Sequence, residues 1–320
     1  MTEPFGTYTS YVDSISNHRV SRRGHAMKGL YVHPRAGAVG HVLNLLVNSR
    51  RLAACRRAVL SHLPFAVLES DVTDVIYATW MVDVRKAATF APAGAQLWQC
   101  QGKTPFTILC YRHGHFGPRF AGPLRRVFPS PLQSNWRLYL EQPMPAAPQL
   151  ATVAFVQNVF SSAVYAASTR LFSDALPSHL AACFELVVDA QTACVRIDPG
   201  LGSAPQLAMT LKRGCEPELP PAFRGMFKSW GEAVERLASQ EAAVVEVVSA
   251  GAVALATISL PVAVERIEPL QLDTRALRCP MLDKMGASSE AFGFLLPKVR
   301  FSALSEALLP AQRGDIGLLY

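Results

Sequence analysis

The spacing of hydrophobic positions changes near residue 62 of the chain. Between residues 38 and 60, apolar residues recur at intervals of three and four, which predicts a helix. After residue 62, short runs of β-branched and aromatic residues alternate with turn residues, which predicts strands. The predicted strands cover 75–82, 105–112, 135–141, 183–190, 192–198, 206–213, 243–249, 253–260 and 292–301. Two further helices are predicted, over about 160–173 and 227–239.

This order of elements predicts an α+β protein that is mostly antiparallel β, because long helical patterns rarely fall between consecutive strands. A sheet or a barrel is therefore expected rather than βαβ units. Residues 1–36 are polar and irregular and are expected to form a loose arm. The helix follows over 37–62, and one β-rich domain over 63–320, since no linker divides it. Met27 is an alternative start of the chain.

The chain is basic, with a formal net charge of +7, but its arginines occur in scattered pairs and not in runs. We therefore expect no nucleic-acid partner. The basic amphipathic helix at 38–60 is of a kind that lies on membranes, although such helices more often pack on their own domain. The most apolar windows, 151–167 and 242–264, are interrupted by polar residues, so no stable membrane insertion is expected.

The cysteines indicate a reducing compartment. Seven cysteines occur without a Cys-x-x-Cys pair and without metal-ligand spacing to histidine. Reduced thiols in the cytoplasm are expected, and no metal and no cofactor. The N-terminus also lacks the apolar core of a secretory signal.

The stretch 111–140 combines histidines, arginines, glycines and prolines, which is typical of a stiff loop that holds charged groups. In the following strand, 135–141, polar and apolar residues alternate, so one face carries hydrogen-bonding groups. If that face lines a barrel, Arg137 is a candidate to bind a carboxylate, because a guanidinium group can donate two parallel hydrogen bonds to an oxyanion. The predicted substrate-binding residues are Arg112, His113, Asn135, Arg137 and Tyr139.

The predicted catalytic residues are His115, as general acid or base, and Lys103 or Lys298, as an imine-forming amine. Lys103 precedes a buried strand and Lys298 lies within an apolar one. A structural role for the histidines and a surface position for either lysine stay open at this point. The sequence also leaves open which face of strand 135–141 lies inside.

Four segments resemble a bacterial family labelled domain of unknown function 2071, over most of residues 65–301. They are "DVIYATWMVDVRKAATFAPAGAQLW", "TPFTILCYRHGHFGPRFAGPLRRVFPSPLQSNWRLYL", "RIDPGLGSAP" and "TISLPVAVERIEPL". That family is similar to a distant branch of the acetoacetate decarboxylase-like superfamily. The resemblance implies a β-barrel with an internal cavity and a few flanking helices, often dimeric. The adjacent lysine pair that acetoacetate decarboxylase uses has no counterpart in this sequence.

We therefore expect a small carboxylate or oxo acid as the ligand, bound in the barrel cavity. Lyase, dehydratase and aldol-type reactions are open, as the resemblance implies. The alternative is a non-catalytic protein that binds a small ligand on the same fold, which the missing lysine pair favours. Whether the protein is an enzyme is left open by the sequence.

Overall fold

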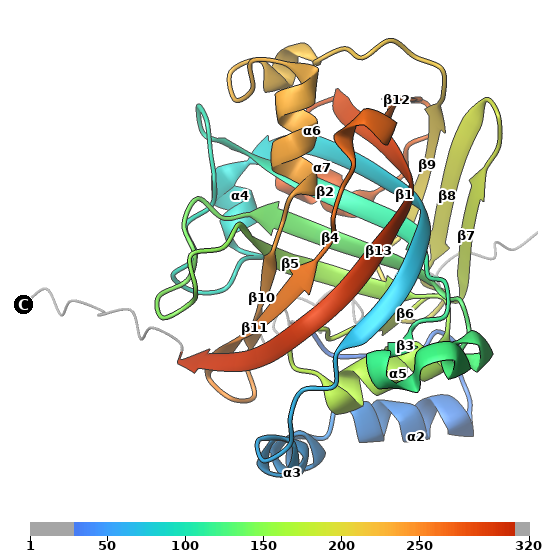
Figure 1. Cartoon of the computed structure of the whole chain (residues 1–320), viewed down its shortest axis with the longest axis vertical. Helices are drawn as coiled ribbons and strands as arrows, with labels where there is room; N and C mark the ends of the chain where they lie inside the picture. The colour runs from blue at the N-terminus through green and yellow to red at the C-terminus, as the bar shows by residue number, and fades with distance from the viewer. Residues whose placement is uncertain (1–28, 311–320) are drawn as a thin grey trace, which may run out of the picture.

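The computed structural model describes residues 29–310 of the chain, so Met27 lies outside the described residues (Figure 1). The strands are β1 (Leu68–Asp83), β2 (Lys103–Arg112), β3 (Gly117–Pro118), β4 (Leu132–Tyr139), β5 (Thr152–Phe160), β6 (His179–Leu180), β7 (Cys183–Val188), β8 (Thr192–Asp198), β9 (Leu207–Lys212), β10 (Ala242–Val247), β11 (Ala252–Ser259), β12 (Glu268–Leu272) and β13 (Ala291–Pro310). The helices are α2 (Ala38–Val47), α3 (Arg50–Leu60), α4 (Val84–Ala88), α5 (Ala163–Phe172), α6 (Trp230–Ala238) and α7 (Pro280–Met285). Three short 3-10 segments are η1 (Arg119–Val127), η2 (Pro221–Phe223) and η3 (Val264–Arg266).

The mixed α+β architecture with a mostly antiparallel sheet is confirmed, and each predicted strand has a counterpart. The strands β5 and β12 and the two-residue strands β3 and β6 were not predicted. The residues of β5, "TVAFVQNVF", form a strand whose two ends are buried on both faces, so they lack the alternation that marks a half-exposed strand. Within residues 29–310, no helix has both the length and the apolar content needed to cross a bilayer.

The strands pair along a path that returns to its start. Each strand in the order β1, β2, β4, β5, β10, β11, β13 is hydrogen-bonded to the next, and β13 also pairs with β1. Only β5 and β10 run parallel in this path. The β12 strand pairs with β13 and with β9, and so joins β9, β8 and β7 to the path as an outer layer. Figure 1 shows β13 and β1 curving together across the molecule.

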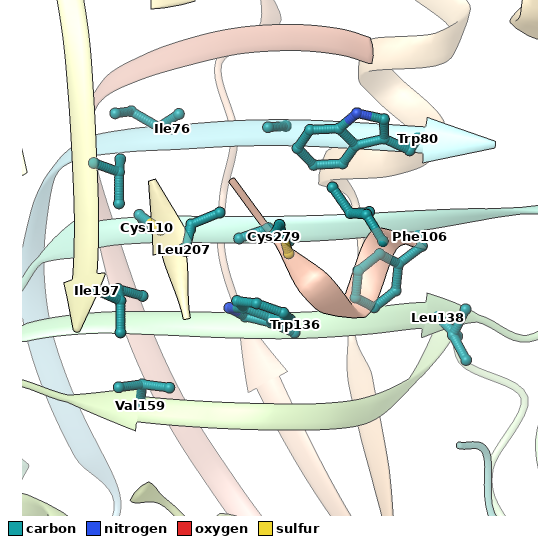
Figure 2. Close-up of a cluster of buried hydrophobic side chains, with 14 of the residues drawn as sticks. Ile76, Trp80, Phe106, Cys110, Trp136, Leu138, Val159, Ile197, Leu207 and Cys279 are labelled. Carbon is teal, nitrogen blue, oxygen red and sulfur yellow. The ribbon is translucent and has the colours of Figure 1, made fainter. Parts of the chain in front are cut away.

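The central parts of β1, β2, β4 and β10 are buried on both faces. One face packs against β7–β9 and α7, and we call it the β8 face; its core includes Trp80, Phe106 and Trp136 (Figure 2). The other face packs against η2 and α6, and we call it the α6 face; its core includes Tyr77 and Phe294. The two faces alternate along each strand, so neighbours in the sequence belong to different cores.

The predicted single helix over 38–60 is two helices, because the chain turns at Asn48 and Ser49. Ser49 caps α3 by accepting a hydrogen bond from the Leu52 N–H at 3.3 Å. The Asn48 side chain accepts from the Tyr31 N–H at 2.9 Å and donates to the Tyr31 carbonyl at 2.8 Å. The polar side chains thus satisfy backbone groups at the break, which helical periodicity alone does not reveal.

The described part of the predicted loose arm, residues 29–36, is irregular but packed onto the domain. The backbone of Val32 and Pro34 bonds to the turn between β8 and β9, through Ser203 and Leu201. At Gly200, where φ is +55°, an added Cβ would approach the Pro34 carbonyl to 2.9 Å. A glycine at this position is therefore required both by the turn and by the close approach of the arm.

A candidate anion site around Arg137

Arg137 lies on the α6 face of β4 and is buried, with 3% of its surface exposed. Its Nη2 donates a 2.7 Å hydrogen bond to the carbonyl of Leu237, near the end of α6. Its guanidinium carbon lies 5.3 Å from the ring centroid of Tyr77 and 5.4 Å from that of Tyr139. Among residues 29–310, no carboxylate pairs with this cation. Its observed partners are the partial negative charge of a helix end, the faces of two rings, and the Tyr139 hydroxyl, to which Nε donates at 3.4 Å.

A chain of hydroxyl groups leads to Arg137 from the neighbouring strands. Thr79 on β1 and Thr107 on β2 lie 2.8 Å apart between their hydroxyl oxygens. The Thr107 hydroxyl is 2.8 Å from the Tyr139 hydroxyl, which donates to the Leu237 carbonyl at 3.1 Å. The register explains this arrangement, because Thr79 pairs with Thr107 and Thr107 with Arg137. Three adjacent strands therefore contribute polar side chains to one patch of a largely apolar face.

Two buried oxygens near this patch have no hydrogen-bond partner among the described residues. They are the Tyr77 hydroxyl and the Asn135 Oδ1, and Asn135 stands two residues before Arg137 on the same face of β4. The Asn135 Nδ2 is satisfied, since it donates to Asn158 Oδ1 at 2.6 Å. A buried polar atom without a partner is costly, so both oxygens are available to a ligand or to water.

Two phenols of the α6 face, Tyr77 and Tyr111, stay protonated at neutral pH. Burial raises the pKa of Tyr77, and Arg137 lowers it only in part. Burial also raises the pKa of Tyr111, a residue of β2 that pairs with Gln133 on β4. Because phenols that stay protonated donate hydrogen bonds, Tyr77 complements Arg137 as a second donor toward an anion.

His113 is held in a separate buried network at the end of β2. Its Nε2 lies 2.6 Å from Gln133 Oε1 and its Nδ1 lies 2.8 Å from Ser70 Oγ, and its ring stacks on Phe116 with centroids 4.2 Å apart. The amide oxygen can only accept, so Nε2 carries the proton. Burial lowers the pKa of His113 to about 4, despite the hydrogen bond to Gln133. A neutral, fully bonded imidazole is suited to joining strands.

The structure brings together only part of the predicted site. Asn135, Arg137 and Tyr139 share the α6 face, whereas Arg112 lies on the β8 face and donates to the Leu186 carbonyl at 3.3 Å. His115 is exposed, with a positive φ of 52°. The expected position of Arg112 and His115 beside Arg137 is therefore wrong, because β2 ends at Arg112 and the chain turns away.

The lysines stay outside the packed interior. All six within residues 29–310 are exposed: Lys86, Lys103, Lys212, Lys228, Lys284 and Lys298. At Lys298 the alternation of β13 breaks, since Leu296 and Val299 both belong to the α6-face core while Pro297 and Lys298 between them are exposed. Lys103 lines a surface hollow of about 180 Å³, together with Met81 and Met226.

That hollow lies at the end of the α6 face. Met81 belongs to the core of this face and stands two residues after Thr79 on β1. The opposite wall of the hollow is formed by η2 and the residues after it, up to Met226. The hollow thus borders the same core as the polar patch, but Tyr77, Arg137 and Tyr139 are not among the residues that line it.

The sequence analysis missed Tyr77 as a member of the patch. The segment "VIYATWMV" does place Tyr77 and Thr79 on one face, which is the signal that was available. The missing information was the strand order, because Tyr77 meets Arg137 only through the pairing of β1 with β2 and of β2 with β4.

Comparison with solved structures identifies the fold. The enduracididine biosynthesis enzyme MppR, with HEPES buffer bound, aligns with 78% of this chain and 89% of its own, at 12% identity and a TM-score of 0.50. An acetoacetate decarboxylase-like enzyme from Sphingomonas wittichii RW1 aligns with 78% of this chain and 95% of its own, at 9% identity and a TM-score of 0.51. No family model and no curated protein matches the chain. The chain has the fold of acetoacetate decarboxylase-like proteins, and its narrower place in the domain of unknown function 2071 family stays a prediction.

Proposed function

We propose that this protein binds a small carboxylate or oxo acid on the α6 face, with the carboxylate held by Arg137 and the hydroxyl of Tyr77. The observation that carries the proposal is a buried guanidinium with no carboxylate partner among residues 29–310, beside two buried oxygens without partners. Burying an unpaired charge costs several kcal/mol, so a ligand anion at this position stabilises the protein.

The proposed site lies inside a β-barrel that the returning path of strands forms, with 63–320 as its domain. The resemblance to acetoacetate decarboxylase-like proteins supports this arrangement, an internal cavity, a homodimer and a cytoplasmic location. In the structure described here, core side chains fill the space between the hollow at Lys103 and the patch at Arg137. The segment from η2 to α6 therefore has to shift to admit a ligand. Such a shift would change the hydrogen bond from Arg137 to the Leu237 carbonyl.

Reversible binding fits the chemistry of this patch better than catalysis. A general acid or base works best with a pKa near neutrality. Burial raises the pKa values of Tyr77 and Tyr111, and it lowers that of His113 to about 4 within a closed network. The exposed positions of His115 and Lys298 offer no enclosed surroundings for proton transfer or for an imine.

The test is a calorimetric titration of the full chain with pyruvate, and with acetone as a control that lacks the carboxylate. Two charge-assisted hydrogen bonds are worth about 3–5 kcal/mol, so pyruvate is expected to bind at least about 100-fold more tightly than acetone. Equal binding of the two, or no binding of pyruvate or any larger oxo acid in the same assay, contradicts the proposal.

A second candidate function is imine-based lyase chemistry at Lys103, favoured by the position of this lysine beside the hollow. Incubation with pyruvate and cyanoborohydride, followed by intact mass measurement and peptide mapping, tests it. Stoichiometric labelling of Lys103 that Lys103→Arg abolishes supports a lyase. Labelling that is absent, or that spreads evenly to Lys212 and Lys298, removes this candidate and leaves reversible binding.

A further inference from the structure

Helix α2 is apolar on its covered side and on its exposed side. Leu43 and Val47 pack against the cluster that contains Tyr31, Phe116 and Phe160. Beside them, an exposed stripe follows helical spacing and consists of Val39, Val42, Leu45 and Leu46. Surface helices normally present polar residues to water, so this stripe is a helix face without a partner among residues 29–310.

The segment η1 adds a second set of exposed apolar side chains at the same end of the molecule. Phe120 is 82% exposed and Val127 is 79% exposed, and Leu124 lies between them. Helix α5 joins the two sets, because it packs against α2 and α3 and its Tyr165 hydroxyl donates to the Phe116 carbonyl at 2.7 Å. Figure 1 shows α2, α3 and α5 gathered below the sheet, beside β3, which leads into η1.

Positive charge surrounds these apolar side chains. Residues 29–68 and 84–140 contain no Asp or Glu. Arg50, Arg51 and Arg126 are exposed and have no carboxylate partner among the described residues. The nearby carboxylate of Asp174 is already paired with Arg56 and Arg57. The surface therefore combines apolar side chains with uncompensated cations.

We propose that the end formed by α2, α3 and η1, which we call the basal surface, docks on an anionic phospholipid bilayer. The apolar side chains would enter the headgroup region while the arginines contact lipid phosphates and carboxylates. Electrostatic repulsion argues against a second copy of the chain, since the exposed arginines of two basal surfaces would meet while the nearby carboxylates Glu69, Asp71 and Asp174 are already paired. Nucleic acid is not the proposed partner, because its backbone presents phosphates to a protein and offers little contact to the exposed phenylalanine, leucine and valine side chains.

Co-sedimentation of the full chain with vesicles tests this inference. Binding is expected to vesicles of phosphatidylcholine with about 30% phosphatidylserine, to be weak with phosphatidylcholine alone, and to fall as salt rises. The double variant Arg50→Gln/Arg51→Gln is expected to bind roughly 30-fold more weakly, because each basic residue near an anionic surface contributes a factor of about five. Phe120→Ser is expected to weaken binding roughly tenfold, through lost apolar burial.

Matched controls come from exposed residues elsewhere. Arg224→Gln/Arg275→Gln removes the same charge, and Val187→Ser removes an exposed apolar side chain on β7; both are expected to bind as the unchanged chain does. Equal losses in these controls, or binding that does not depend on phosphatidylserine, overturn the inference. It is also overturned if sedimentation velocity without lipid shows a dimer that Val42→Asp dissociates, since a second copy then covers the surface.

Discussion

Arg137→Gln is expected to weaken the binding of an oxo acid such as pyruvate by about 100-fold or more. The change removes the buried cation of the polar patch on the α6 face and leaves the Tyr77 hydroxyl as a donor toward the anion. Arg137→Lys keeps the charge and loses the planar pair of donors, so an intermediate loss of about tenfold is expected. Calorimetric titration of the three proteins measures the effect.

The matched control is Arg112→Gln, which alters an arginine of the neighbouring strand that lies on the β8 face. Its affinity is expected to equal that of the unchanged chain. Folding of the Arg137 variants is checked by thermal unfolding, and the Leu237 carbonyl keeps a donor in the Tyr139 hydroxyl. Undiminished affinity in Arg137→Gln would rule out the proposed site, whereas a loss in Arg112→Gln of the same size would rule out its location.

The free energy of unfolding is expected to fall as the pH falls from about 6.5 to 4, because two buried histidines resist protonation. Burial lowers the pKa of His113 to about 4 and that of His179 to about 3, the latter with help from Arg170. Below pH 6.5 the unfolded chain binds protons that the folded chain does not, so protonation favours unfolding. Each histidine is expected to contribute about 3 kcal/mol of destabilisation at pH 4.

Urea unfolding at a series of pH values measures this loss. In His113→Gln the titrating group is absent, so the slope of unfolding free energy against pH should become shallower between pH 4 and 6.5. The exposed His115 provides the control, and His115→Gln should keep the original slope. Unchanged slopes in both variants would mean that His113 protonates as easily in the folded chain as in the unfolded one.

Local patterns along the chain were sufficient for the type of fold and for most of its strands. The segments around Trp136 and around Val195 alternate or are rich in β-branched residues, and they form β4 and β8 with nearly the predicted bounds. The alternation of side chains along a strand also predicted that Asn135, Arg137 and Tyr139 share one face of β4. These features depend only on neighbours in the sequence, because alternation of side chains is a property of each strand by itself.

The positions of two other predicted site residues, Lys298 and His115, could not be predicted from local patterns, because an irregularity within a strand and a chain turn determine them. Lys298 points outward because the alternation of β13 breaks there: Leu296 and Val299 both lie in the α6-face core, and the two residues between them are exposed. His115 leaves the sheet because β2 ends three residues earlier. A one-residue shift along a strand moves every following side chain to the other face, and the local sequence pattern does not reveal where such a shift occurs.

Hydrophobic periodicity along this chain thus defines which segments become strands and which side chains share a strand face. It does not define which strands are neighbours, which face meets α6, or where a register shifts. Those features arise from pairings between residues far apart in the sequence, such as Tyr77 with Leu109 and Leu109 with Asn135. The unpaired charge of Arg137, and with it the candidate site, exists only once these strands have come together.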